Sequence, residues 1–158
     1  CIRDRDGIYV LTAKDWDSTV PAATMNWRTQ TSFDPLLGAI GVKADSGAYD
    51  TLKKSGSFAL NFLGKGQQGQ AFTFFKPAEA GNGTISGGDN RDGFSESPIL
   101  EGAIACVQFS ASKIVARVDH HIVIGEAVHA HADAPIVGQP HDAILHWREL
   151  SNNVFNGG

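Results

Sequence analysis

Short apolar runs and alternating apolar and polar positions recur along most of the chain, which predicts strands more than long helices. β-branched and aromatic side chains fill Gly7 to Ala13, and apolar positions alternate from Ser57 to Leu63. Leu36 to Val42 is apolar and short enough for a buried strand. Longer strands are expected over Ala103 to Arg117 and over His121 to Ala132.

Three further segments extend or interrupt this pattern. Ala23 to Phe33 is a long extended stretch of mixed polar and apolar residues, and Asp34-Pro35 ends it. Ala143 to Arg148 alternates again and predicts a last strand. Residues 77 to 98 are rich in glycine and poor in large apolar side chains, so we expect a long surface loop there.

Two short helices are expected between the strands. Ser46 can cap a helix over Ala48 to Ser55, and Gly56 stands where a helix-ending glycine belongs. A second helix is expected from Gln68 to Phe75, with Pro77 stopping it. About seven strands without regular helical crossovers predict a mainly β fold, an antiparallel barrel with short peripheral helices. One domain over residues 1–158 suits this length.

Composition narrows the possible partners. The net charge of −4 and the absence of any dense basic run argue against nucleic-acid binding. No apolar stretch approaches the roughly 18 residues that span a bilayer, and no signal or transit pattern is visible, so no membrane partner is expected. Cys1 and Cys106 are expected as free thiols, which suits a cytoplasmic location.

Gly64 to Gly69 matches the G-x-G-x-x-G pattern of dinucleotide-binding sites, after a predicted strand and before a predicted helix. Such a site also needs a second strand that ends in an acidic residue about 20 positions later. Asp89 has that spacing, but the residues before it lack a strand pattern. A glycine-rich turn is therefore favoured over a dinucleotide site.

The six histidines raise the possibility of a metal site. His129 and His131 would share one face of a strand, and Asp119, His120 and His121 are further candidate ligands. No Cys pair or H-E-x-x-H spacing supports zinc. Solvated or hydrogen-bonded histidines are therefore favoured, and no metal is expected.

Thr24 to Ser32 places polar side chains at nearly every other position of a strand that should be central. Buried polar groups are costly unless something satisfies them. One interpretation is a barrel strand with one face exposed to solvent. The other is a strand that lines a ligand, and a flavin would suit it because the ring edge and the phosphate both form hydrogen bonds.

Three motifs in order resemble the flavin reductase-like, FMN-binding split-barrel family. Ala23 to Pro35 is similar to the family's polar strand followed by Ser-Phe-x-Pro-Pro. Ser55 to Leu63 resembles S-G-x-F-x-x-N-x-L, and Asp119 to Ala127 resembles the end of G-D-H-x-I-x-x-G-E-V. The resemblance extends from about Gly7 to Arg148, and the tail from Val154 is similar to the flavoredoxin-like branch.

The resemblance implies a split antiparallel β-barrel that binds FMN, or FAD, and takes electrons from NAD(P)H. Thr24, Met25, Asn26 and Trp27 would line the isoalloxazine ring. His120 would lie at the reactive face of the flavin, where reduced nicotinamide stacks. Its neighbour His121 should point to the opposite side of the strand. The cofactor carries the chemistry, so no protein nucleophile is required.

The resemblance also implies where the phosphate is held. Ser32 would lie near the ribityl or phosphate end, and Ser46 and Ala48 would start the helix that faces the phosphate. A helix N-terminus suits an anion. Lys76 is the candidate for a direct charge partner of the phosphate.

Two positions depart from the family pattern. Leu36 replaces the second proline of the Pro-Pro pair, which changes the turn. Val118 replaces the glycine before Asp-His and adds a side chain beside the nicotinamide site.

The resulting hypothesis is an NAD(P)H-dependent flavin reductase. The alternatives are a non-enzymatic FMN electron carrier of flavoredoxin type, served by a redox partner protein, and a flavin- or haem-binding storage or sensor module. A homodimer with flavin at or near the interface is also expected. The chain has more aromatic residues than a small barrel interior obviously needs, and aromatics are enriched at interfaces: Trp16, Trp27, Trp147, Tyr49, Phe74 and Phe75.

Overall fold

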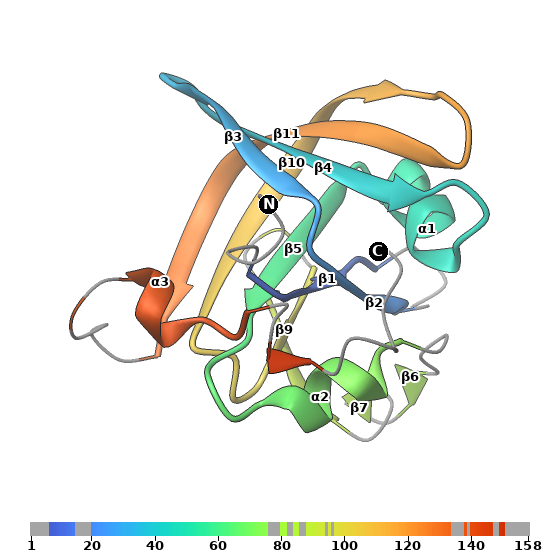
Figure 1. Ribbon diagram of the computed structural model, residues 1–158. Coiled ribbons are helices and arrows are strands. Elements are labelled where there is room, and N and C mark those ends of the chain that lie inside the picture. The colour runs from blue at the N-terminus through green and yellow to red at the C-terminus, as the bar shows by residue number, and fades with distance from the viewer. Residues whose placement is uncertain are drawn as a thin grey trace.

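The computed structural model describes residues 7–14, 20–75, 80–81, 84–85, 88–93, 95, 97–133, 138, 140–146 and 149–150. These residues form two antiparallel sheets and three short helices (Figure 1). The larger sheet has the strand order β2-β1-β5-β10-β11-β4-β3. Its strands are β1 (Tyr9–Thr12), β2 (Ala22–Met25), β3 (Arg28–Phe33), β4 (Leu36–Lys43), β5 (Ser57–Phe62), β10 (Ala105–Val115) and β11 (His120–Ala132).

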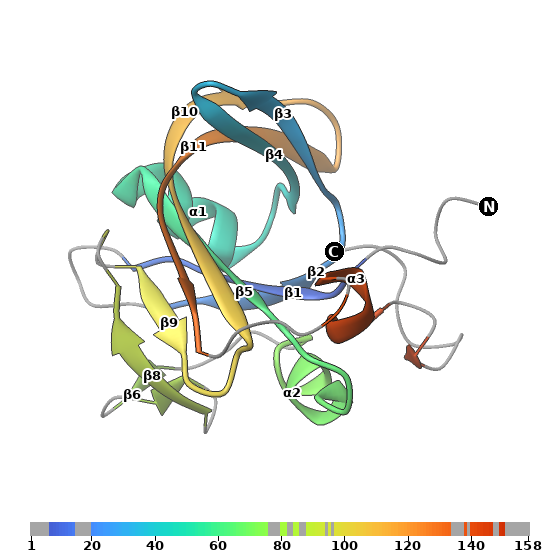
Figure 2. The same cartoon turned by 90° about the vertical axis from the view of Figure 1, so that its left-hand side faces the viewer.

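The larger sheet curls because its two edge strands are consecutive in the chain. β2 and β3 lie at opposite edges, yet only Asn26 and Trp27 separate them. Figure 2 shows the strands arranged around a common interior. The Arg28 guanidinium of β3 reaches across, with Cζ 4.9 Å from the ring centroid of Tyr9 and 5.3 Å from that of Phe62. The predicted mainly β, antiparallel barrel with peripheral helices is confirmed.

Helix α1 (Gly47–Ser55) closes one side of the barrel interior. It starts one residue before the predicted Ala48 and ends at the predicted Ser55. The Ser46 side chain accepts a hydrogen bond from the Tyr49 amide, and Gly56 adopts a left-handed φ of 69°. The rings of Phe58 and Phe109 stack 5.0 Å apart in the interior. The core between sheet and helix includes Tyr9, Leu11, Met25, Ile40, Val42, Ala48, Tyr49, Leu52, Phe58, Leu60, Phe109 and Val123.

A second core lies on the other side of β1 and β5, under helix α2 (Gln68–Thr73). Ile8, Val10, Leu63 and Leu145 are among its buried residues. Helix α2 ends two residues before the predicted Phe75. No helix in the described part of the chain is long and apolar enough to cross a membrane.

The glycine-rich segment before α2 forms a turn, as predicted. Gly66 has a φ of 87°, and the preceding strand β5 pairs antiparallel with both of its neighbours, β1 and β10. A dinucleotide fingerprint requires a parallel βαβ unit, which this arrangement is not.

The prediction of a long loop over residues 77 to 98 is wrong. β6 (Ala80–Gly81), β7 (Thr84–Ile85) and β8 (Gly88–Asp92) pair in order with β9 (Pro98–Leu100) to form the smaller sheet. β6 and β7 have two residues each, which is too short for an alternating pattern to mark them in the sequence.

The prediction of a strand from Ala143 to Arg148 is also wrong. Helix α3 (Pro140–Ala143) occupies its start, and Ile144 and His146 make only isolated bridges, to Gly64 and Gly7. Leu145 lies between them and is fully buried. The alternation of apolar and polar residues in this segment therefore reflects the burial of Leu145 rather than a strand. Residues 147 and 148 lie outside the described residues.

Buried polar side chains attach β9 to the barrel. Asn61 is completely buried, and its Nδ2 donates to the Val10 carbonyl and to Thr12 Oγ1, both at 3.1 Å. Its Oδ1 accepts from the Leu100 amide at 2.9 Å. Thr12 Oγ1 in turn donates to the Pro98 carbonyl. Every polar atom of the Asn61 amide group is therefore used.

Replacing Asn61 with leucine keeps the side-chain size but leaves these buried groups unsatisfied. Since each such group costs about 1–3 kcal/mol, we expect Asn61→Leu to lower the free energy of unfolding by about 2–4 kcal/mol in urea titrations. Ser112→Ala is the control, because Ser112 Oγ donates to the Ile124 carbonyl at an exposed position. A change within about 0.5 kcal/mol is expected there. Similar losses for both variants would contradict the anchoring role of Asn61.

Candidate functional site

The link between β2 and β3 presents the Trp27 ring on the outside of the barrel. The Trp27 carbonyl accepts from the Gly41 amide at 3.0 Å, which fixes the link to the middle of β4. A Cβ atom added to Gly41 would lie 3.1 Å from Trp27 Cε3, so the ring packs directly on this glycine. Trp27 stays 42% exposed. Its outer face is therefore available to a flat ligand.

His120 lies against this indole. The ring centroids of Trp27 and His120 are 4.6 Å apart. His120 begins β11 and pairs in register with Lys43 of β4. The next residue, His121, faces the opposite side of the strand, where its ring lies 4.6 Å from that of Tyr49 in α1. The predicted division of the two histidines between opposite faces is confirmed.

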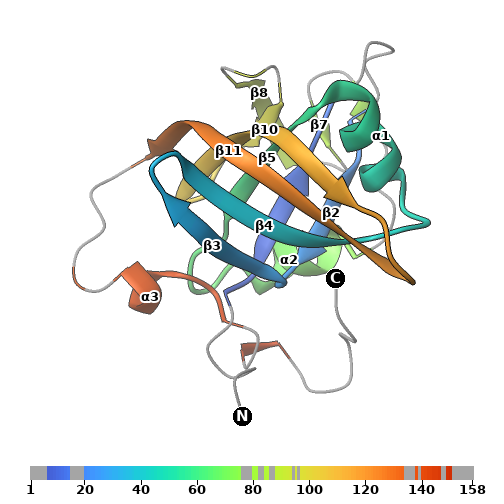
Figure 3. The same ribbon diagram turned by 90° about the horizontal axis from the view of Figure 1, so that it is seen from above.

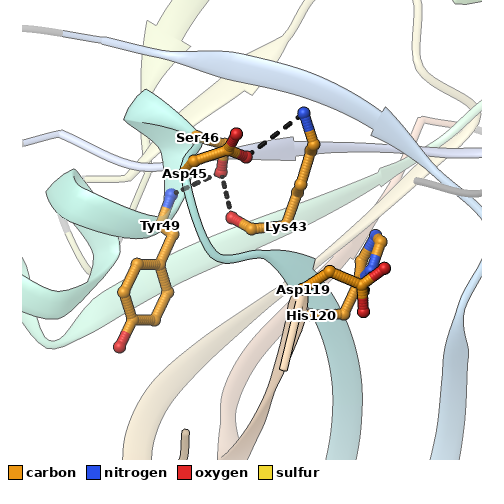
Figure 4. Close-up of polar contacts among 6 residues, drawn as sticks. All are labelled: Lys43, Asp45, Ser46, Tyr49, Asp119 and His120. Atoms are coloured by element: carbon orange, nitrogen blue, oxygen red, sulfur yellow. Dashed lines mark hydrogen bonds and ion pairs between the residues drawn. The ribbon is translucent and has the colours of Figure 1, made fainter. Parts of the chain in front are cut away.

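Asp119 lies beside His120 at the start of β11 (Figure 4). The distance between Asp119 Oδ1 and His120 Nδ1 is 3.4 Å. Hydrogen bonding from the His120 side chain holds the pKa of the exposed Asp119 carboxyl below its ordinary range. The Asp119 carbonyl accepts from the Ala44 amide at 2.9 Å, which joins this turn to the end of β4.

The same end of β4 leads into the N-terminus of α1 (Figure 4). Ser46 Oγ accepts from the Tyr49 amide at 3.2 Å and donates to the Lys43 carbonyl at 2.7 Å. The hydroxyl is thus occupied within the protein. The amides of Gly47 and Ala48 remain as the helix-end donors, and a Cβ at Gly47 would meet nothing within 4 Å. This open, electropositive helix end suits an anionic group.

Asn26 supplies a second feature that fits a ligand. Its side chain is 8% exposed, and its Oδ1 has no hydrogen-bond partner among the described residues. A buried acceptor without a donor is costly, so natural sites of this kind are completed by water or ligand. An N–H group on a bound ring would satisfy it.

Two predicted ring-lining residues point elsewhere. Thr24 is buried, and its Oγ1 donates to the Ala71 carbonyl at 2.7 Å, which fastens β2 to α2. The Met25 side chain is 2% exposed and packs in the barrel core. The structure brings neither side chain together with Trp27 and His120.

The residues proposed to hold the phosphate do not all lie together in the structure of one chain. Ser32 pairs with Leu37 at the start of β4, whereas Ser46 follows its end. Within one chain the two serines therefore lie at opposite ends of a strand. Ala48 has a buried side chain and offers only its amide. Lys76 lies outside the described residues.

Sequence reasoning missed Gly41 and did not place Lys43 in the site. Gly41 interrupts an apolar strand, a signal for close approach of another group. The Nζ of Lys43 forms an ion pair with Asp45 Oδ1 at 3.2 Å (Figure 4). Among the described residues, no group of three or more His, Cys, Asp or Glu side chains is placed to hold a metal ion.

Substituting Gly41 with alanine tests whether this glycine positions Trp27. We expect Gly41→Ala to displace the ring, to shift the emission of Trp27 and to destabilise the protein by about 1 kcal/mol, because overpacking costs about that much. Trp27→Phe gives the background from Trp16 and Trp147. Gly47→Ala is the matched control, since its new methyl group would enter open space. An unchanged Trp27 emission in Gly41→Ala would count against the contact.

Comparison with known proteins identifies the family. A model described as "Flavin reductase like domain" matches residues 5–150. A protein of Rhizobium meliloti (strain 1021), named as a probable flavin reductase, is 31% identical over 119 residues, which is 75% of this chain and 37% of that protein. A flavin reductase of Pseudomonas putida is 29% identical over 119 residues, 75% of this chain and 68% of that protein.

A solved structure has the same fold. The NADH:FAD oxidoreductase SgcE6 of Streptomyces globisporus C-1027 superposes with a TM-score of 0.71 at 27% identity, over 80% of this chain and 75% of that chain. The likeness confirms the split-barrel fold implied by the three sequence motifs. With its family match and its fold, this chain belongs to the flavin reductase-like domain family.

Proposed function

We propose that this chain binds FMN, with FAD as the alternative, and reduces it with NAD(P)H. The observation that carries the proposal is the Trp27–His120 ring pair, which lies where β4 leads into the N-terminus of α1. An exposed flat surface beside helix-end amides suits a ring that carries a phosphate. The NADH:FAD activity in the name of the Streptomyces relative supports the reaction type.

The residues present fit such a cofactor. Asn26 Oδ1 would accept from the ring, Trp27 would contact its surface, and the amides of Gly47 and Ala48 would face the phosphate. The flavin supplies the hydride-accepting chemistry. Lys76 remains the proposed charge partner of the phosphate.

His120 orients the nicotinamide in this proposal. Its ring lies between Trp27 and Asp119, and its side chain is 17% exposed. Asp119 faces Nδ1, which fixes the ring orientation and directs the remaining edge away from the carboxylate. A structure of the Streptomyces relative in complex with NAD and FAD fragments supports NADH as the donor and FAD as a possible cofactor.

Anaerobic mixing of the protein with FMN and NADH tests this function. We expect rapid bleaching of the oxidised flavin, and we expect His120→Ala to slow it by about tenfold or more while the FMN affinity stays within about twofold. His121→Ala is the matched control, since its ring faces Tyr49 on the other side of β11. Absence of flavin binding in equilibrium dialysis would contradict the proposal. Bleaching only with a redox partner protein would establish the electron carrier instead.

We also propose a homodimer with the flavin near the interface. Phe33 and Leu36 pair at the tip of the β3–β4 hairpin and are 89% and 45% exposed. Figure 3 shows this hairpin extending along β11, whose Val128 is also exposed. Exposed apolar groups that lie together mark interaction surfaces. In a dimer, Ser32 beside this tip would approach a flavin bound by the other copy.

Light scattering of the flavin-loaded protein tests the dimer. The expected mass is about twice the 16.8 kDa of one chain, and Phe33→Ser should lower it towards a single chain by placing a polar group in the contact. Phe72→Ser is the control, because Phe72 is 39% exposed on α2, away from the hairpin. A single-chain mass for the unaltered protein at micromolar concentration would refute the dimer.

A further inference from the structure

The turn between β10 and β11 holds an unusual residue. Val118 has a φ of 47° and is the only non-glycine residue in the described part of the chain with a positive φ. A β-branched side chain crowds its own backbone in this left-handed region. Glycine or asparagine would adopt the same conformation at lower cost.

Nothing within the described chain offsets that cost. Val118 is 92% exposed, so its apolar side chain gains no burial. The turn is secured by other atoms, namely the hydrogen bond from the Ala44 amide to the Asp119 carbonyl. A strained and exposed valine therefore contributes nothing to folding, and persistent strain of this kind is associated with functional sites.

The place of Val118 indicates what its side chain meets. It stands two residues before His120, whose ring contacts Trp27, and directly before Asp119. Val118 is thus exposed to solvent in the turn that leads into His120. In the proposed function, the molecule that arrives from solvent at His120 is the nicotinamide dinucleotide, which carries flat heteroaromatic rings with apolar faces.

We propose that Val118 is a specificity-determining residue for the nicotinamide donor, and that the strained turn holds its side chain where a ring of that donor covers it. This inference rests on the proposed function. Burial of the isopropyl group then occurs only in the complex, so it contributes to donor affinity and not to protein stability.

Val118→Gly and Val118→Asn remove the side chain and relieve the strain together. With FMN saturating, both should raise the KM for NADH by about five- to tenfold, because the apolar contact is lost, while kcat stays within about twofold. Both should also raise the midpoint of thermal unfolding by a few degrees, roughly what relief of such backbone strain gives. Ala116→Gly, an exposed change in the same turn region, is the control and should leave the KM unchanged.

Calorimetric titration with NAD⁺, which donates no hydride, separates this inference from the proposed function. The flavin-loaded protein should bind NAD⁺, and Val118→Gly should weaken that binding by about five- to tenfold. If the protein binds NAD⁺ in this way but NADH does not reduce the flavin, the reductase proposal fails and the role of Val118 stands. NAD⁺ affinity that is absent, or equal in Val118→Gly and the unaltered protein, overturns the role of Val118.

Discussion

The barrel depends on the two residues that connect its opposite edges. Asn26 and Trp27 must turn the chain from β2 to β3, and these strands terminate the larger sheet at either side. The hydrogen bond from the Gly41 amide to the Trp27 carbonyl fixes that connection to β4. The Arg28 guanidinium adds a contact across the closure, over the rings of Tyr9 and Phe62. Of the two side chains on this link, Trp27 is exposed and can be reached by a ligand.

Two buried asparagines differ in whether their side-chain oxygens find hydrogen-bond partners within the described part of the chain. Asn61 satisfies both polar atoms of its amide within the protein and connects β5 to β1 and β9. Gln108 acts similarly, with its Oε1 accepting from the Ser95 amide and hydroxyl at 2.7 and 2.9 Å. Asn26 is almost as buried, yet its Oδ1 has no partner in the described part of the chain. Asn61 is therefore part of the scaffold, and Asn26 belongs to the candidate site.

Local patterns predicted the parts of the fold that local physics determines. Alternation located β5, and β-branched and aromatic content located β1. The capping chemistry of Ser46 and Gly56 indicated both ends of α1. Strand periodicity also placed His120 and His121 on opposite faces. Patterns failed where strands are too short to alternate, as in β6 and β7, or where burial produces the same alternation as a strand, as around Leu145.

The packing of Trp27 on Gly41 also constrains how the sequence can evolve. A large ring at position 27 favours glycine at position 41, since a methyl group there would lie 3.1 Å from the indole. A side chain at position 41 is therefore disfavoured while the indole is present. Loss of the indole would remove this constraint on β4. The two positions should consequently covary across homologous sequences, although they are 14 residues apart in the chain.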